Sequence, residues 1–263
     1  MNALFFGSLI VYFLATVLQF AALVFKKEGL GRIAWLAFLA AFCAHTLYIV
    51  IRGVVAHRLP LSNQYEFATA FSWGVSLLLV ILRIRLKADW LSAVVMPMSF
   101  FILSYAALQP RTVTDLMPAL RSGWFGFHIG SAVISYAAFV VAGCVALRYI
   151  LLSRKNRKED AFRLEQMDFL SYRMIALGIL MLTVTILTGA FWVEQAWGAF
   201  WIWDPKEVWA LITWIIYVVY LHLRLRGKKK GLFMAWYALI SVPVVLFTFA
   251  GVNTLMSGLH SYG

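Results

Sequence analysis

The chain has 263 residues, which is long enough for two soluble domains, but 63% of them are hydrophobic and only 13% are charged. This balance is typical of membrane proteins and excludes an ordinary water-soluble domain. The formal net charge of +12 does not indicate nucleic-acid binding, because the basic residues lie in short segments between apolar runs, as topology signals do. We therefore expect an integral membrane protein surrounded by lipid, with no nucleic-acid partner.

Eight stretches are apolar and long enough to cross a bilayer, which takes about 20 residues in a helix. They are Ala3–Phe25, Ile33–Val55, Phe67–Ile84, Trp90–Leu108, Trp124–Leu152, Met174–Trp192, Val208–Leu225 and Leu232–Met256. The sequence thus predicts an all-α fold, a polytopic membrane helix bundle of about eight transmembrane helices that forms a single integral-membrane domain over residues 1–263. The charged connection Ser153–Arg173 is predicted to form either an amphipathic surface helix, separate from the sixth stretch, or a solvated connector.

Lysine and arginine are distributed unevenly over the connections between these stretches. All but five of the 23 fall on one side of the membrane, and the other side holds Arg52, Arg58, Arg111, Arg121 and Lys206. Basic residues accumulate on the cytoplasmic side, so the side with few of them is expected to face outward. An even number of spans then places the N- and C-termini on that same outer, periplasmic side.

The most distinctive stretch is residues 192–209, a predicted periplasmic connection that holds five of the protein's eleven tryptophans. They are Trp192, Trp197, Trp201, Trp203 and Trp209. Trp197 and Trp201 would share one face in helical geometry, and with Trp203 and Phe200 they would form a rigid aromatic surface for a large flat ligand. The alternative is an aromatic belt at the membrane surface, although such a belt is usually scattered over many helix ends.

A helix is predicted to start directly after these tryptophans. Asp204 suits the N-cap, Pro205 the first helical position and Glu207 the third. Another pair, Asn63 and Glu66, has the spacing of a capping box at the start of the third stretch. Asp204 thus has a structural role whether or not it also contributes to a ligand site.

The string WGAFWIWDPKEVWA resembles the tryptophan-rich haem-handling signature, the WWD domain, of cytochrome c biogenesis proteins. Its Asp-Pro-Lys-Glu continuation is most similar to the CcsA/ResC branch, the haem-handling half of system II cytochrome c synthesis. Phe200 stands where a second Trp or a Tyr is often found, and it keeps a flat apolar ring. The string from Pro60 to Glu66 also resembles a segment of this family, and the resemblance covers most of the chain from about Pro60 onward.

Two of the five histidines are expected at the outer face. His128 begins the fifth stretch and His260 follows the eighth, which places both beside the tryptophans. A lone histidine at that level usually makes simple hydrogen bonds, but imidazole is also a normal axial ligand for haem iron. The segments GWFGFHIG and GLHSYG resemble the external ligand segments of the family, which implies that His128 and His260 bind the iron of an outer haem.

The other histidines lie at different depths. His222, in the seventh stretch, is roughly 21 Å below the outer face at the rise of an α-helix. Its side chain could simply reach the inner interface, but its segment resembles the family segment that carries a haem ligand inside the membrane, which implies an inner haem iron. His45, in the second stretch, either shares that site or bonds a neighbouring helix. The second role is favoured, because the resemblance implies that a partner subunit supplies the second inner ligand. His57, in a polar loop, is expected to be solvated and is a spare candidate for the outer site.

The resemblance also implies a function. CcsA-type proteins carry haem b to the outer face, hold it reduced and, with a ResB/CcsB-type partner, attach it by two thioether bonds to the C-x-x-C-H motif of apocytochrome c. Holocytochrome c synthase activity is therefore expected only in the complex, with no catalytic residue beyond those that position haem. The residues implied in haem binding are His128, His260, Trp197, Trp201, Trp203, Asp204, His222 and His45.

Two alternatives stay open at this point. One is a haem exporter or chaperone that passes haem to a separate ligase, and the other is a membrane b-type cytochrome or regulatory membrane protein. Lys206 and Arg121, both on the expected outer side, could pair with the haem propionates, although anchoring at the interface explains them equally well. The expected location is the bacterial cytoplasmic membrane, or the thylakoid membrane if the gene is plastid-encoded.

Overall fold

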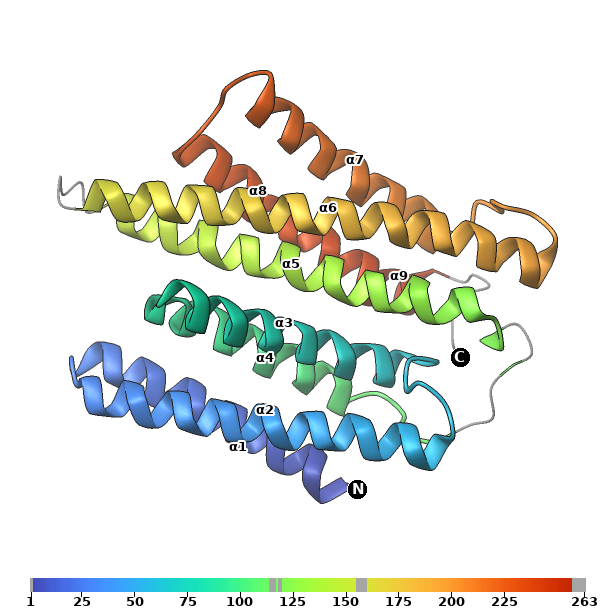
Figure 1. Cartoon of the computed structure of the whole chain (residues 1–263), viewed down its shortest axis with the longest axis horizontal. Helices are drawn as coiled ribbons and strands as arrows, with labels where there is room; N and C mark the ends of the chain where they lie inside the picture. Colours follow the sequence, from blue (N-terminus) through green and yellow to red (C-terminus); the bar gives the residue numbers. More distant parts are fainter. Residues whose placement is uncertain (1, 114–116, 118–119, 155–159, 257–263) are drawn as a thin grey trace. The chain divides into compact units, whose positions relative to one another are not determined.

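The secondary structure follows from the long apolar runs of the sequence. The structure is a computed structural model that describes residues 2–113, 117, 120–154 and 160–256. Figure 1 shows its helices, which divide into two compact units, residues 1–115 (unit 1) and 116–263 (unit 2), described here one at a time. Within these described residues, eight helical segments are long and apolar enough to span a membrane, which confirms the all-α prediction. The orientation across the membrane and the single-domain organisation stay predictions.

Unit 1 contains α1 (Asn2–Val24), α2 (Glu28–Ala56), α3 (Gln64–Leu86), a 3-10 turn (Asp89–Leu91) and α4 (Ser92–Ala107). Helix α1 packs along α2 and α4, and α3 packs on α4. The buried residues of α2 are spaced three and four apart, so they form one face of the helix. They are Ala34, Phe38, Ala41, His45, Tyr48 and Arg52. Because His45 and Arg52 are ionisable, the interior of this unit contains polar groups that need partners.

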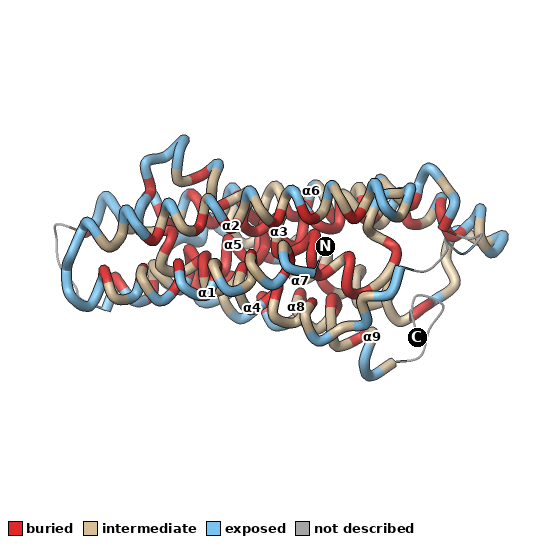
Figure 2. Tube along the Cα trace, turned by 90° about the horizontal axis from the view of Figure 1, so that it is seen from below, coloured by how far each residue is buried: buried red, intermediate tan, exposed pale blue. Residues whose placement is uncertain are grey.

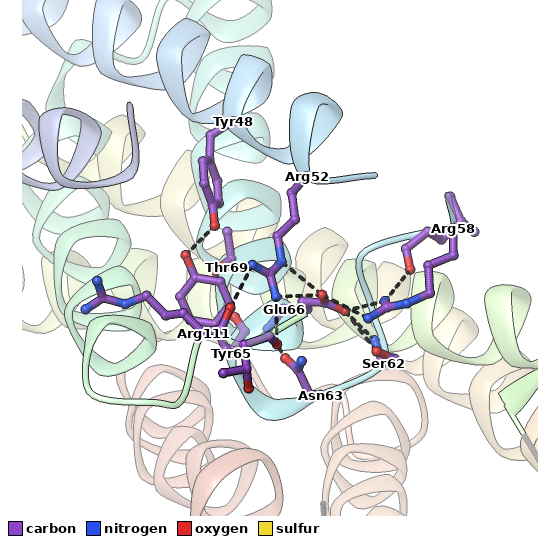
Figure 3. Close-up of polar contacts among 11 residues, drawn as sticks. Tyr48, Arg52, Arg58, Ser62, Asn63, Tyr65, Glu66, Thr69 and Arg111 are labelled. Atoms are coloured by element: carbon purple, nitrogen blue, oxygen red, sulfur yellow. Dashed lines mark hydrogen bonds and ion pairs between the residues drawn. The ribbon is translucent and has the colours of Figure 1, made fainter. Parts of the chain in front are cut away.

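Glu66, near the start of α3, is the centre of a buried ion-pair network (Figure 3). Its carboxylate accepts hydrogen bonds from Arg52 Nε (2.9 Å), Arg58 Nη1 (2.7 Å) and the Ser62 backbone N–H (2.8 Å). Arg52 also donates to the backbone carbonyl of Arg111 at 3.2 Å. The network therefore joins the end of α2, the α2–α3 connection, the start of α3 and the segment that follows α4.

The capping box predicted for Asn63 and Glu66 is only half formed. Asn63 Oδ1 accepts the Glu66 N–H at 2.9 Å, as expected for an N-cap. The Glu66 carboxylate, in contrast, binds the two guanidinium groups and the Ser62 N–H instead of the N–H of Asn63. Charged donors are stronger partners for a carboxylate than a single peptide N–H. The spacing predicted the cap but not the ion pairs.

Unit 2 contains α5 (Gly123–Ser153), α6 (Ala161–Trp197), α7 (Pro205–Leu225), α8 (Leu232–Leu246), a π-helical turn (Phe247–Gly251) and α9 (Val252–Leu255). Helix α5 packs most extensively on α6 and also contacts α8, while α7 lies on α6 and α8. Most residues of α5 are buried (Figure 2). The residues that position the tryptophan-rich connection therefore come from α5, α6 and α7.

Small residues allow α5 and α6 to approach closely. Gly178 on α6 faces the ring of Phe139 on α5, and a Cβ atom at position 178 would collide with that ring. The Ser135 hydroxyl donates to the carbonyl of Gly178 at 2.8 Å. The Phe139 ring stacks on Tyr217 of α7 with 3.7 Å between centroids. Since lipid gives no hydrophobic drive between helices, such close packing is a main source of their association.

Helix α6 is longer than predicted, and the separate surface helix predicted over Ser153–Arg173 is wrong. One helix runs from Ala161 to Trp197 and includes the predicted sixth span. Its buried residues continue at three- and four-residue spacing across the predicted boundary. They include Met167, Leu170, Ser171, Met174, Ile175 and Gly178. Arg163 and Glu165 of its first turns are exposed, whereas Asp168 is only 11% exposed and pairs with Arg224 of α7.

Replacing Glu66 with Gln should destabilise unit 1 strongly. Gln keeps the shape of the side chain but leaves the guanidinium of Arg52, which is 2% exposed, without its countercharge. Removing one partner of a buried ion pair typically costs about 3–5 kcal/mol of unfolding free energy. Thermal and denaturant unfolding of the purified protein in detergent, followed by circular dichroism, measures the loss.

The matched control is Asp89→Asn, which breaks the ion pair between Arg83 and an Asp89 side chain that is 79% exposed. This change should cost at most about 1 kcal/mol, because solvent screens the pair. An equal loss in the two variants would contradict the role assigned to the buried network.

Candidate functional site

The tryptophan-rich stretch is divided between two helices and a short connection. Helix α6 ends at Trp197, because Gly198 adopts a left-handed conformation (φ 75°) and its N–H bonds the Glu194 carbonyl at 2.8 Å. Helix α7 begins at Pro205. The connection proper is therefore residues 198–204, which is shorter than predicted.

This division separates the tryptophans. Trp192 lies within α6 and Trp209 within α7. Trp197 and Trp201 do not share a helical face as predicted, because the helix ends between them. The aromatic residues that remain accessible must therefore be identified from their contacts rather than from helical spacing.

We call six aromatic side chains at this end of unit 2, each exposed at least in part, the aromatic surface. They are Trp124, Phe191, Trp197, Phe200, Trp201 and Trp203. Phe191 stacks on Trp124 of α5 at 5.0 Å and meets Phe200 edge-on at 5.9 Å. Trp201 meets Trp203 edge-on, also at 5.9 Å. Large aromatic side chains gathered at one exposed place mark a surface for a ligand or partner.

The backbone at Trp203 is strained. Its φ of 58° lies in a region that bulky residues rarely adopt, and its side chain is 72% exposed. Glu207 holds the backbone on both sides, since its Oε2 accepts the N–H of Ile202 (3.0 Å) and of Asp204 (3.3 Å). Strained residues of this kind gather at ligand sites, where the surrounding structure enforces them.

The predicted helix start at Asp204 is confirmed. Asp204 is the N-cap of α7, and its Oδ1 accepts the Lys206 N–H at 2.9 Å. Pro205 occupies the first helical position, and Glu207 completes a capping box. The Asp204 residue is buried, and the contact with the Lys206 N–H shows that its carboxylate caps the helix. A further role for Asp204 in haem binding stays a prediction.

His128 lies in the second turn of α5, and a carbonyl of α6 fixes its orientation. Its Nδ1 is 2.8 Å from the carbonyl oxygen of Thr185. A carbonyl oxygen only accepts hydrogen bonds, so Nδ1 carries the proton and Nε2 is the nitrogen with the lone pair. Metal-ligating histidines are commonly oriented by such a hydrogen bond from the other ring nitrogen.

Two further residues of α6 place the His128 ring. Gly189 lies against it, since a Cβ atom there would be 2.8 Å from Nδ1 and 2.9 Å from Cε1. Trp192 stacks on the ring with 5.8 Å between centroids and 21° between planes. Trp192 is buried and meets Trp197 edge-on at 5.1 Å. The imidazole is therefore connected through Trp192 to the aromatic surface.

Sequence reasoning selected His128 but missed the residues that orient it. Thr185, Gly189 and Trp192 follow one another on one face of α6 at spacings of four and three residues. A glycine in such a row, facing another helix, is a signal of close approach. Which helix approaches there depends on the pairing of α5 with α6, and the sequence does not show that pairing.

The donor set at His128 fits a metal carried in a planar macrocycle. Among the described residues, no three His, Cys, Asp or Glu side chains form a metal-binding group. His128 instead offers one oriented imidazole beside flat aromatic rings. Haem iron takes its four equatorial ligands from the macrocycle and needs only axial ligands from a protein. The residues present therefore fit haem.

The other predicted ligands lie elsewhere. His222 is exposed in the last turn of α7, about 26 Å along the axis from the start of that helix. His45 belongs to α2 in unit 1, where it is fully buried with its Nδ1 3.4 Å from the Tyr12 hydroxyl. His260 lies outside the described residues. The ligand roles of these three histidines stay predictions.

Two substitutions of Asp204 test whether its carboxylate does more than start α7. Asn keeps an oxygen that can accept the Lys206 N–H, whereas Ala removes it and should lower the unfolding free energy by about 1 kcal/mol. We expect the natural stability and haem retention in Asp204→Asn and a loss of stability in Asp204→Ala, measured by thermal unfolding in detergent. If Asn lowers haem retention as much as Ala, the carboxylate has a role beyond capping.

Comparison with known proteins places the chain in a family. Residues 61–260 match the family described as "Cytochrome C assembly protein". The cytochrome c biogenesis protein CcsA of Guillardia theta is 32% identical, and the match covers 92% of this chain and 89% of the relative. CcsA of Parasynechococcus marenigrum (strain WH8102) is 34% identical, with 98% and 94% covered.

A solved structure is also similar. The cytochrome c haem lyase CcmF matches 98% of this chain with a TM-score of 0.69 and 16% sequence identity, and the match spans 46% of the CcmF chain. At that identity the likeness shows a shared fold. The resemblance to CcsA-type proteins predicted from the sequence is confirmed by the relatives and by the family match, which covers most of the chain. The chain therefore belongs to the cytochrome c assembly protein family.

Proposed function

We propose that this protein is the haem-handling subunit of a cytochrome c synthase. It brings haem b to the outer membrane face and holds it reduced for attachment to apocytochrome c. The observation that carries the proposal is the His128 imidazole, oriented by the Thr185 carbonyl and connected through Trp192 to the aromatic surface. Membership of the cytochrome c assembly family supports a role in cytochrome c biogenesis.

The protein acts by positioning haem, which is its substrate. The residues proposed to hold it at the outer face are His128, His260, Trp197, Trp201, Trp203 and Asp204. The two imidazoles would fix the iron, and the indole rings would shield the faces of the macrocycle from water. One edge stays open for the incoming thiols. Holding both reactants in this geometry removes much of the entropic cost of the reaction.

Attachment itself is an addition that consumes no oxidant or reductant. Each cysteine S–H of the C-x-x-C-H motif adds across one vinyl group of haem. Sulfur bonds to the vinyl carbon next to the macrocycle, the thiol hydrogen goes to the terminal carbon, and the double bond becomes a single bond. The histidine of the substrate motif then takes the place of one of the protein's imidazoles on the iron.

The proposed direction of transport follows from the distribution of Lys and Arg, which favours an outward-facing tryptophan connection. His222, at the far end of α7, then lies in the inner half of the bilayer. We assign it to an inner site that ligates haem on its way outward, because iron and propionates are costly to leave without partners in hydrocarbon. His45 or a residue of the partner would complete that inner site.

The proposed partner is a ResB/CcsB-type membrane subunit, and the protein substrate is apocytochrome c. The relationship to CcsA proteins favours a synthase subunit over a haem exporter that serves a separate ligase. The relatives come from cyanobacteria and from plastid-containing organisms. The proposed location is accordingly the bacterial cytoplasmic membrane, or the thylakoid membrane for a plastid-encoded chain.

Replacing His128 with Gly tests the outer ligand. When the variant is produced with its partner, it should fold but lose cytochrome c maturation, because the iron loses one axial nitrogen. Added imidazole should restore part of the maturation by occupying the same coordination position. Haem staining of the c-type cytochrome and the optical spectrum of the purified complex measure both effects.

The control for this experiment is His57→Gly, at the exposed left-handed C-cap of α2, which should leave maturation and spectrum unchanged. An unchanged low-spin spectrum in His128→Gly would overturn the assignment of His128 as a ligand.

Replacing Gly189 with Ala should disturb the same site without removing the ligand. The added methyl would lie 2.8 Å from His128 Nδ1, so the ring must move away from the Thr185 carbonyl. We expect weaker haem retention, a changed reduction potential and a stability loss of about 1–3 kcal/mol, as is typical of overpacking. Gly130→Ala is the matched control, because a Cβ there meets no atom of the described structure within 4 Å. Equal behaviour of the two variants would show that Gly189 does not position the imidazole.

A further inference from the structure

A second buried carboxylate, Asp168, joins three segments of unit 2. Its Oδ1 and Oδ2 accept hydrogen bonds from Nη1 (2.8 Å) and Nη2 (2.6 Å) of Arg224, in the bidentate geometry of a strong ion pair. Its Oδ1 also accepts the backbone N–H of Gly231 at 3.0 Å. Asp168 lies in the second turn of α6, Arg224 at the end of α7, and Gly231 directly before α8. We call this arrangement the Asp168–Arg224 clamp.

The clamp differs from an ordinary surface ion pair. The side chains of Arg224 and Asp168 are only 8% and 11% exposed, and the guanidinium also lies 5.3 Å from the centre of the Tyr172 ring. In the nearby pair of Arg163 and Asp160 the charged atoms are 3.8 Å apart and the side chains are 71% and 12% exposed, so solvent reaches the guanidinium but hardly the carboxylate. Burying a pair of charges is costly, so such a pair is usually retained for what it holds in place.

The histidine on this segment of α7 is His222. It lies two residues before Arg224 in the last turn of α7, and its carbonyl accepts the N–H of Arg226 at 2.9 Å. Tyr220, which is buried and meets Tyr237 of α8 edge-on at 5.8 Å, is the last buried residue of α7, and beyond it Arg224 makes the ion pair that holds the end of the helix. The rotation and depth of the last turn, and with them the direction of the exposed His222 side chain, therefore depend strongly on the clamp.

We propose that the Asp168–Arg224 clamp positions His222 for binding the inner haem iron. The inference rests on the proposed function, in which His222 is the inner ligand, and adds Asp168 and Arg224 as positioning residues. A bidentate Arg–carboxylate pair fixes both the distance and the plane of its partners, whereas a Lys at position 224 would fix neither. The Gly231 N–H bonds Asp168 to the segment before α8. Helix α7 itself is held by the two Arg224 bonds, which a turn of α7 about its axis would break.

The test compares Asp168→Asn and Arg224→Gln with the natural protein, each purified in complex with its partner subunit. Imidazole is titrated against the complex while the spectrum and the reduction potential of the bound haem are recorded. If the clamp positions His222, its bond to iron weakens, and imidazole should compete at a concentration about tenfold lower, the usual effect of losing a residue that orients a metal ligand. Arg224→Lys should fall between these variants and the natural protein.

The matched control is Arg163→Gln, which removes the exposed ion pair at the same end of α6 and should leave the imidazole titration unchanged. A purely structural clamp would lower the yield and thermal stability of the variants but would not change the imidazole concentration needed for competition or the reduction potential, and that result would overturn the inference.

His222→Gly distinguishes a failure of the inner site from a failure of the clamp. If it has natural inner haem content and spectrum, the inner site itself is wrong. If it loses inner haem and recovers it with imidazole while Asp168→Asn behaves like the natural protein, only the clamp is wrong.

Discussion

Lipid offers no hydrogen-bond partners, and this constraint decides how polar residues are used in both units. Many hydroxyl side chains bond their own helix, as Thr16 does to the Tyr12 carbonyl at 2.8 Å, and others bond a neighbouring helix, as Ser135 does to the Gly178 carbonyl. The carboxylates of Glu66 and Asp168 go further, because each accepts donors from several segments. Glu66 joins the end of α2 to α3, and Asp168 joins α6 to α7 and α8. A single charge would be unfavourable to bury, and the paired charges here connect the ends of neighbouring helices.

The candidate site depends on close packing between α5 and α6 within unit 2. Glycines of α6 let aromatic rings of α5 approach its backbone, with Phe139 against Gly178 and His128 against Gly189. At position 189 the approach also brings an imidazole nitrogen within hydrogen-bonding distance of a helix carbonyl. A packing feature thereby fixes a tautomer, and the tautomer determines which nitrogen can bind a metal. The contact between α5 and α6 therefore also positions the candidate ligand His128.

Sequence reasoning predicted what is set locally. Apolar runs of sufficient length predicted the helices, and Asp204 was recognised as an N-cap because a cap depends on its immediate neighbours. Contacts between distant segments could not be predicted, which is why Thr185 beside His128 and Arg52 beside Glu66 were missed. The extent of α6 differs from the prediction for another reason. The charge of its first turns indicates a surface helix, although the buried face of α6 continues there at helical spacing.

The unbroken length of α6 makes it a stiff rod that carries contacts for two distant groups. Thr185, which orients His128, follows Asp168, which holds the end of α7, by about 26 Å of helical rise. The whole helix is about 55 Å long, well beyond the hydrocarbon thickness of a bilayer, so it must tilt or extend past the lipid. A tilt moves both positions as one lever. In a bilayer of different thickness, a change in the tilt of α6 would displace the two positions together, because one continuous helix carries both.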